Sequence, residues 1–133
     1  MANLLALDVG TVRIGVAAAD STVPVAMPLA TIDVNGEELE TVKKLVEERS
    51  IDVVIIGYPR NQAGEATEQT AISESFGRKV AVFTHVIYQD ESLTSVMAED
   101  RLRQSGKPYT KADIDAFAAM IILQDYLEQN YAA

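Results

Sequence analysis

Apolar residues recur along the chain with two different spacings, and the change from one to the other predicts the order of its elements. Short apolar runs that end in turn residues are typical of strands, whereas apolar residues three and four positions apart are typical of amphipathic helices. The predicted strands cover residues 3–9, 13–19, 23–32, 51–57 and 85–90. The predicted helices cover residues 37–49, 66–83, 92–105 and 111–128. This order predicts an α/β fold in which a mixed five-stranded sheet carries helices on both faces.

The connections between these elements narrow the topology. Only the turn at Gly10 separates the first two strands, and because no crossover helix fits there, the two strands are expected to form an antiparallel hairpin. Two prolines in the segment 23–32 are typical of an edge strand. Residues 80–83 could either finish the second helix or form a strand. Thr110 and Asp113 resemble a capping box at the start of the last helix.

Composition bounds the class of protein. The 133 residues match the usual size of a single domain, and no linker interrupts them, so one domain covering residues 1–133 is expected. The chain has no cysteine, which excludes disulfides and thiolate metal sites and favours the cytoplasm. The apolar N-terminal stretch lacks a basic region and is interrupted by Asp8, so a signal peptide is not expected. No apolar run is long enough to cross a membrane, so a membrane partner is not expected either.

The charge pattern bears on nucleic-acid binding. A net charge of −9 argues against such a partner, because contacts to phosphates need lysine and arginine. One stretch, residues 101–111, nevertheless holds four basic residues and no acid. It is either a solvated helix end and loop or a phosphate-binding surface. The candidate nucleic-acid contacts are Arg13, Arg60, Arg101, Arg103, Lys107 and Lys111.

Three acids occupy positions at which a carboxylate calls for a structural or a functional explanation. Asp8 ends a strand of leucines, and it either caps the turn that follows or binds a ligand. Glu91 lies between a strand and a helix, where the helix dipole alone would favour an acid. Asp115 is the most informative, because a helical wheel puts it on the apolar face of its helix, whereas Asp113 falls on the polar side. The residues that share the face of Asp115 are Ala118, Ala119, Ile122 and Tyr126.

These acids come from two strand ends and one helix, and they are expected to converge at the carboxyl edge of the sheet. Carboxylates that repel one another call for a cation, and oxygen ligands favour Mg²⁺ or Mn²⁺. Zinc is not expected, since the chain has one histidine and no cysteine. Such a site can hold two ions about 3.5–4 Å apart, which activate a water and stabilise the leaving oxygen of a phosphodiester.

Four segments carry recognisable motifs, in chain order LALDVGTVRIGVAAAD, GYPRNQAG, QDESLTS and DIDAFAAMIILQDYL. Together they resemble the RuvX/YqgF family, described as Holliday-junction resolvases or pre-ribosomal-RNA nucleases of the RNase H-like superfamily. The resemblance covers nearly the whole chain and implies Asp8, Glu91 and Asp115 as the catalytic acids, with Arg13 matching the first motif. It implies a metal-dependent endonuclease that acts on structured nucleic acid, such as the 5′ end of pre-16S ribosomal RNA. Ser92 stands where the family usually has arginine, a departure that bears on substrate affinity.

Other functions remain open at this point. A resolvase of branched DNA is one, and because a four-way junction is two-fold symmetric, it would act as a symmetric homodimer. A non-catalytic ribosome-assembly or RNA-binding factor that keeps the fold is another. The first segment also resembles the phosphate loop of actin-like ATP-binding domains, although those proteins normally need two such domains and a second motif.

Overall fold

The computed structural model describes residues 2–59, 63, 65–91 and 94–131, and within them a five-stranded sheet has the order β3-β2-β1-β4-β5. The strands are β1 (Asn3–Val9), β2 (Arg13–Asp20), β3 (Val23–Asp33), β4 (Val53–Pro59) and β5 (His85–Glu91). The pairs β1–β2 and β2–β3 are antiparallel, whereas β1–β4 and β4–β5 are parallel. The predicted hairpin, the mixed sheet and the edge position of the third strand are therefore confirmed.

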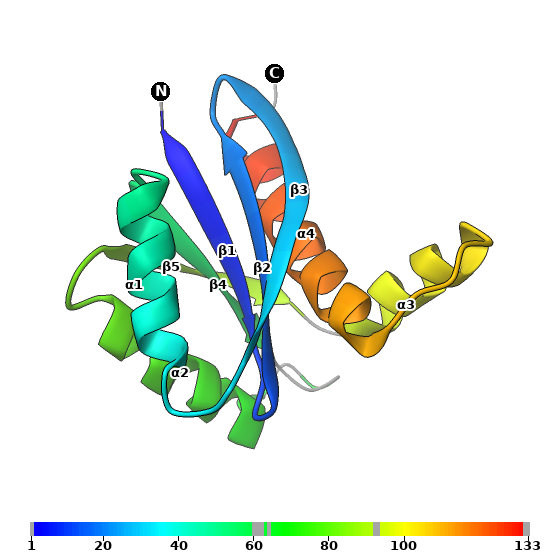
Figure 1. Ribbon diagram of the computed structural model, residues 1–133, viewed down its shortest axis with the longest axis horizontal. Helices are drawn as coiled ribbons and strands as arrows, with labels where there is room; N and C mark the ends of the chain where they lie inside the picture. The colour runs from blue at the N-terminus through cyan, green and yellow to red at the C-terminus, as the bar shows by residue number, and fades with distance from the viewer. Residues whose placement is uncertain (1, 60–62, 64, 92–93, 132–133) are drawn as a thin grey trace.

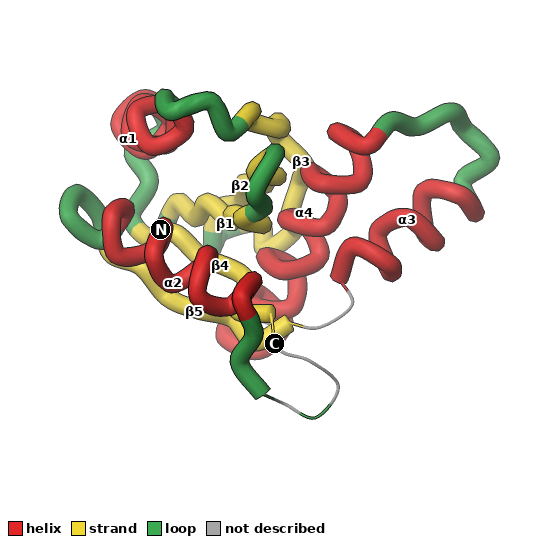
Figure 2. Tube along the Cα trace, turned by 90° about the horizontal axis from the view of Figure 1, so that it is seen from below, coloured by secondary structure: helices red, strands yellow, loops and turns green. Residues whose placement is uncertain are grey.

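Helices cover both faces of the sheet, as predicted (Figure 1). They are α1 (Glu38–Glu48), α2 (Glu68–Val80), α3 (Thr94–Gln104) and α4 (Lys111–Asn130). Helices α1 and α2 lie on one face, and α4 crosses the other over β1, β2 and β3. Helix α3 packs on α4 instead of the sheet and extends away from the body of the molecule in both views (Figures 1 and 2).

Strand β1 separates two apolar cores, because its side chains alternate between the faces of the sheet. Leu5, Leu7 and Val9 belong to the core under α1 and α2. Leu4 and Ala6 belong to the core under α4. All of these leucines are fully buried, and each such side chain stabilises the fold by roughly 1.5–3 kcal/mol. The same alternation puts Asp8 on the face that α4 covers.

The ends of the elements differ from the predicted ranges in places. Helix α2 ends at Val80, so the predicted extension to residue 83 is wrong. The amides of Phe83 and Thr84 bond to the carbonyl of Val80, and the chain turns there into β5. Helix α4 is longer than predicted and reaches Asn130. The strand predicted at 51–57 begins two residues later, at Val53, because the amide of Ile51 still bonds to Val46 in the turn after α1.

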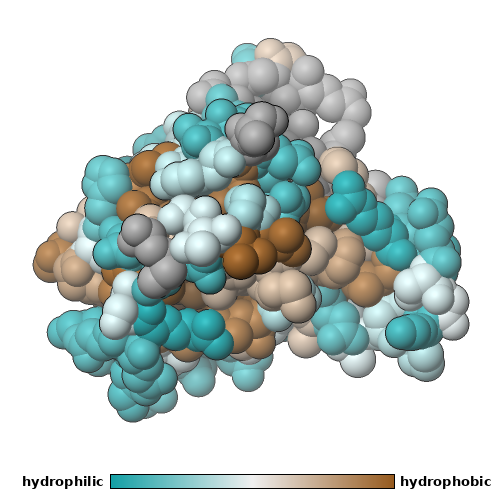
Figure 3. All heavy atoms as spheres, turned by 90° about the horizontal axis from the view of Figure 1, so that it is seen from above, coloured by the Kyte–Doolittle hydropathy of each residue, from teal (hydrophilic) through white to brown (hydrophobic). Residues whose placement is uncertain are grey.

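The surface is mixed, and apolar and polar residues are interspersed on the face shown in Figure 3. Val23, Val25 and Met27 of the edge strand β3 are among the large apolar side chains that are exposed. Of the helices in the described ranges, not one combines the length and the apolar character that crossing a membrane requires.

Candidate active site

Asp8 lies near the carboxyl end of β1, on the α4 side of the sheet. Its backbone pairs with Gly15 of β2 in the antiparallel register. The side chain is partly buried, and within the described residues no hydrogen bond or ion pair to its carboxylate is found. A carboxylate in such a position is costly unless a positive charge or a donor compensates it, and this is a first indication of a ligand.

Gly15 brings the third element of the site onto the sheet. A Cβ atom at this position would overlap the backbone carbonyl of Asp115, so α4 packs directly against the main chain of β2 here. Because Gly15 is also the neighbour of Asp8, this close contact places Asp115 beside Asp8. The sequence analysis did not single out Gly15, although a lone glycine inside an apolar strand is a known sign of close backbone approach.

Arg13 binds the carboxylate of Asp115. Its Nε donates to Oδ2 of Asp115 over 2.5 Å, and the two side chains are 31% and 21% exposed. Arg13 is the first residue of β2 and stands two positions before Gly15, on the same face of the sheet. Charge-assisted hydrogen bonds of this kind are short and strong. The sequence predicted both residues for the site but did not predict that they pair.

The electrostatics of the site follow from this arrangement. Burial, and then the negative charge of Asp115, raise the pKa of Asp8 from 3.8 to about 6. Two carboxylates thus stand close together with one arginine as counter-ion. Their oxygens are hard ligands of the kind that Mg²⁺ and Mn²⁺ accept.

Glu91 lies on the same face but farther along the sheet. Leu7 pairs with Ile56, and Gly57 pairs with Gln89, so Asp8 is level with Gln89 and not with Glu91. Strand spacing and rise then put the Cα atoms of Asp8 and Glu91 roughly 12 Å apart. Within the described ranges, no group of three acids or histidines is arranged to hold a metal ion. The structure therefore brings Asp8 and Asp115 together and leaves Glu91 near them on the same edge.

Asp113 has the capping role that the sequence indicated. Its Oδ2 accepts from the amide of Thr110 at 2.8 Å, and its own amide donates to Oγ1 of Thr110 at 3.2 Å. The side chain is exposed. Two residues further on, Asp115 faces the sheet with the buried side chains of Ala118 and Ala119. The choice of Asp115 over Asp113 for the packed face is confirmed.

The candidate nucleic-acid contacts differ in their surroundings. Arg103 reaches Glu99 at 3.5 Å and Asp100 at 3.4 Å, so acids of its own helix neutralise part of its charge. Arg101, Lys107 and Lys111 are exposed, and no ion pair of theirs is found in the described part of the chain. Lys111 stands four residues before Asp115 and so on the same side of α4. Arg60 and Ser92 lie outside the residues that the structure describes.

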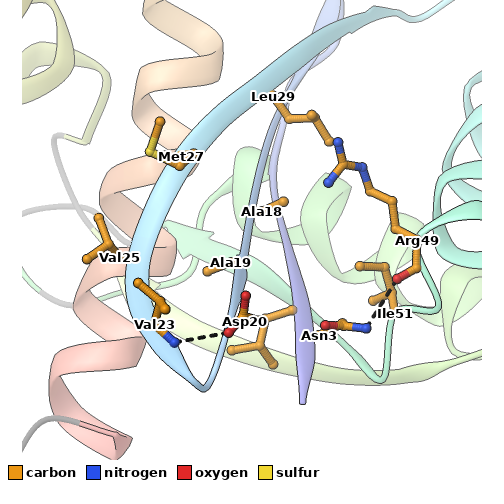
Figure 4. A pocket seen from close by; sticks show the side chains of 11 residues that line it. Asn3, Ala18, Ala19, Asp20, Val23, Val25, Met27, Leu29, Arg49 and Ile51 are labelled. Carbon is orange, nitrogen blue, oxygen red and sulfur yellow. Dashed lines mark hydrogen bonds between the residues drawn. The ribbon is translucent and has the colours of Figure 1, made fainter. Parts of the chain in front are cut away.

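A groove of about 380 Å³ lies at the opposite end of β1 (Figure 4). It is lined mainly by apolar side chains of β2 and β3, among them Ala18, Val23, Val25 and Met27. Asn3 and Arg49 border it, and the Asn3 amide group donates to the Arg49 carbonyl. Asn3 and Asp8 are five residues apart along a strand, or roughly 17 Å, so this groove is separate from the carboxylate pair.

Comparison with known protein families and sequences agrees with the resemblance seen in the motifs. A family model described as "RuvX: Holliday junction resolvase" matches residues 2–129. A protein of Chloroflexus aurantiacus is 44% identical over 131 residues, which cover 94% of this chain and 86% of the relative. A protein of Synechocystis is 41% identical and covers 93% of this chain and 86% of the relative. Both carry the provisional name of a pre-16S rRNA nuclease.

Comparison with solved structures supports the fold. RuvC of T. thermophilus, solved with a Holliday junction substrate, has a TM-score of 0.61 at 14% identity and covers 97% of this chain and 96% of that one. The Fowlpox virus resolvase, solved with Holliday junction DNA, has a TM-score of 0.56 at 14% identity, with 94% and 98% covered. The predicted RNase H-like fold is thus confirmed.

Proposed function

Because the chain belongs to the RuvX family, we propose that it is a metal-dependent endonuclease that matures the 5′ end of pre-16S ribosomal RNA. The relatives named as pre-16S rRNA nucleases support the substrate. The observation that carries the proposal is the pair of carboxylates at Asp8 and Asp115, held side by side by the contact of α4 with Gly15. Among the described residues Asp8 has no hydrogen-bond donor, and two carboxylates this close together favour a divalent cation, which an endonuclease can use to activate water.

The residues present fit a divalent ion. Asp8 and Asp115 offer carboxylate oxygens at one point, and burial together with the charge of Asp115 raises the pKa of Asp8. Glu91 lies on the same face and supplies a third carboxylate if its side chain turns toward the pair. When bound, Mg²⁺ or Mn²⁺ supplies an activated water and stabilises the charge that develops on the phosphodiester.

The chain's own residues would hold and orient the substrate. Arg13 binds Asp115, Lys111 stands one turn before it on α4, and a guanidinium group suits the geometry of a phosphate. The cations on α3 and on the connection to α4 would contact phosphates farther along the strand. These are Arg101, Arg103 and Lys107, with Arg60 proposed from the sequence alone.

The test is a side-by-side cleavage assay with Mg²⁺ or Mn²⁺. The substrates are fragments with the 5′ end of the pre-16S RNA, an unstructured RNA strand and a four-way DNA junction. We expect metal-dependent cleavage of the precursor fragment and none in the presence of a chelator. Lack of cleavage of all three substrates with both metals would contradict the proposal.

A second candidate function is resolution of branched DNA, which the description of the matching family favours. It requires a homodimer with two-fold symmetry, because a junction has two strands to cut. Preference for the four-way junction in the same assay, together with the mass of a dimer in solution, would select it. Either activity would take place in the cytoplasm, which the absence of cysteine from the sequence supports.

A further inference from the structure

The pairing of Arg13 with Asp115 has a consequence for metal binding. Oδ2 of Asp115 is already occupied by the guanidinium of Arg13 at 2.5 Å. A divalent ion that used this carboxylate would stand close to a full positive charge. The two cations compete for one carboxylate and repel each other. Arg13 and the ion would therefore not both stay in close contact with it.

We propose that Arg13 is an internal counter-ion of the metal-free site, which leaves Asp115 when a divalent ion binds and is thereby released to hold the substrate phosphate. This rests on the proposed nuclease function and adds an order of events to it. In the metal-free chain Arg13 neutralises part of the charge of the two carboxylates, and in the loaded chain the ion does so.

The structure supports a role for Arg13 in charge and not in placing the helix. The backbone contact between Gly15 and Asp115 already seats α4 on β2. A second bond, from Oγ1 of Thr31 to the carbonyl of Ala112 at 2.6 Å, ties the start of α4 to β3. Asp115 would therefore stay beside Asp8 after Arg13 had moved away.

The side chain of Arg13 can also move while its main chain stays in place. Its main chain is held in the hairpin, where its carbonyl accepts from the amide of Gly10 at 3.0 Å. Its side chain is 31% exposed and binds Asp115 through Nε. Within the described residues no partner of its two terminal nitrogens is found. Those nitrogens are free to bind a phosphate from solvent.

The first test measures binding of Mn²⁺ alone by titration calorimetry. The variant Arg13→Gln removes the competing charge but keeps a polar side chain, and we expect it to bind Mn²⁺ on the order of tenfold more tightly than wild type. The matched control is Arg49→Gln, an exposed arginine at the opposite end of β1, which should leave the affinity for Mn²⁺ unchanged. Arg13→Lys keeps the charge and should bind Mn²⁺ about as wild type does.

The second test needs no variant and uses the NMR signal of the Arg13 Nε–H group. In the metal-free protein this group is hydrogen-bonded and its proton should exchange slowly. Saturating Mg²⁺ should shift the signal and speed the exchange. An unmoved signal in a protein that binds Mg²⁺ would overturn the inference, and so would weaker or equal binding of Mn²⁺ by Arg13→Gln. If wild type binds neither ion, the proposed nuclease function fails first and the inference fails with it.

Discussion

Replacing Asp8 by asparagine removes a negative charge that the folded protein accommodates poorly. The pKa of Asp8 rises from 3.8 to about 6 through burial and the charge of Asp115. The folded protein therefore binds this proton about two pKa units more tightly than the unfolded chain does. Since one unit corresponds to about 1.4 kcal/mol, the ionised carboxylate lowers the free energy of unfolding by about 3 kcal/mol at neutral pH.

The upward direction of this pKa shift determines how the stability of the protein depends on pH. The stability contributed by the protonated carboxyl is fully present below about pH 4 and is lost as the pH rises through 6. At pH 7.5 in a chelator, Asp8→Asn should accordingly be more stable than wild type by up to about 3 kcal/mol, or roughly 10 °C in Tm. Below pH 4 the advantage should fade. Urea and thermal unfolding of both proteins at the two pH values measure this difference in stability.

Metal should reverse the order of the two proteins. An ion held at the proposed site would bind only the folded state, so wild type should gain thermal stability with rising Mg²⁺ or Mn²⁺ concentration while Asp8→Asn gains much less. Asp113→Asn, which changes an exposed cap, is the control and should lose at most about 1 kcal/mol at any metal concentration. The reasoning is refuted if Asp8→Asn shows no gain at pH 7.5 relative to pH 4, or if it responds to metal as wild type does.

Two further predictions concern the scaffold and the substrate surface. Gly15→Ala should destabilise the protein by about 1–3 kcal/mol or more and reduce cleavage, because the added Cβ pushes α4 away from β2; an unchanged urea midpoint would contradict the close contact. Arg101→Gln combined with Arg103→Gln should weaken RNA binding and flatten its salt dependence, which binding curves at several salt concentrations measure. Since acids of α3 already neutralise part of the charge of Arg103, most of the loss should come from Arg101, and an unchanged salt slope would exclude this surface.

Local pattern was enough to predict most of the fold. The order of elements, the hairpin and the two-sided covering of the sheet follow from hydrophobic spacing and loop length. The helical wheel also separated Asp115 from Asp113, because the capping signal at Thr110 and the small residues after Asp115 are both local. The predicted end of α2 was wrong, and the cause is physical. Val82 continues the apolar pattern but is 86% exposed, and spacing alone does not tell whether an apolar side chain packs.

Features of the site that depend on tertiary structure could not be predicted in this way. Arg13 and Asp115 are separated by 102 positions, and their ion pair requires α4 to cross β2 at Gly15. The place of Glu91 depends on the register between β4 and β5, which no turn connects. The sequence therefore predicted three convergent acids, whereas the structure brings two together and holds the third farther along the same edge.

The central claim is that the packed face of α4 carries a catalytic carboxylate, and two variants of neighbouring residues test it most directly. The measurement is the rate of Mg²⁺-dependent cleavage of the pre-16S RNA fragment by Asp115→Asn and by Asp113→Asn, each shown to be folded by its unfolding curve. We predict that Asp115→Asn loses cleavage by at least a hundredfold, since removal of an essential electrostatic group costs on the order of 10²–10³ in rate, whereas Asp113→Asn cleaves like wild type. Full cleavage by Asp115→Asn, or its loss in Asp113→Asn, would contradict the account.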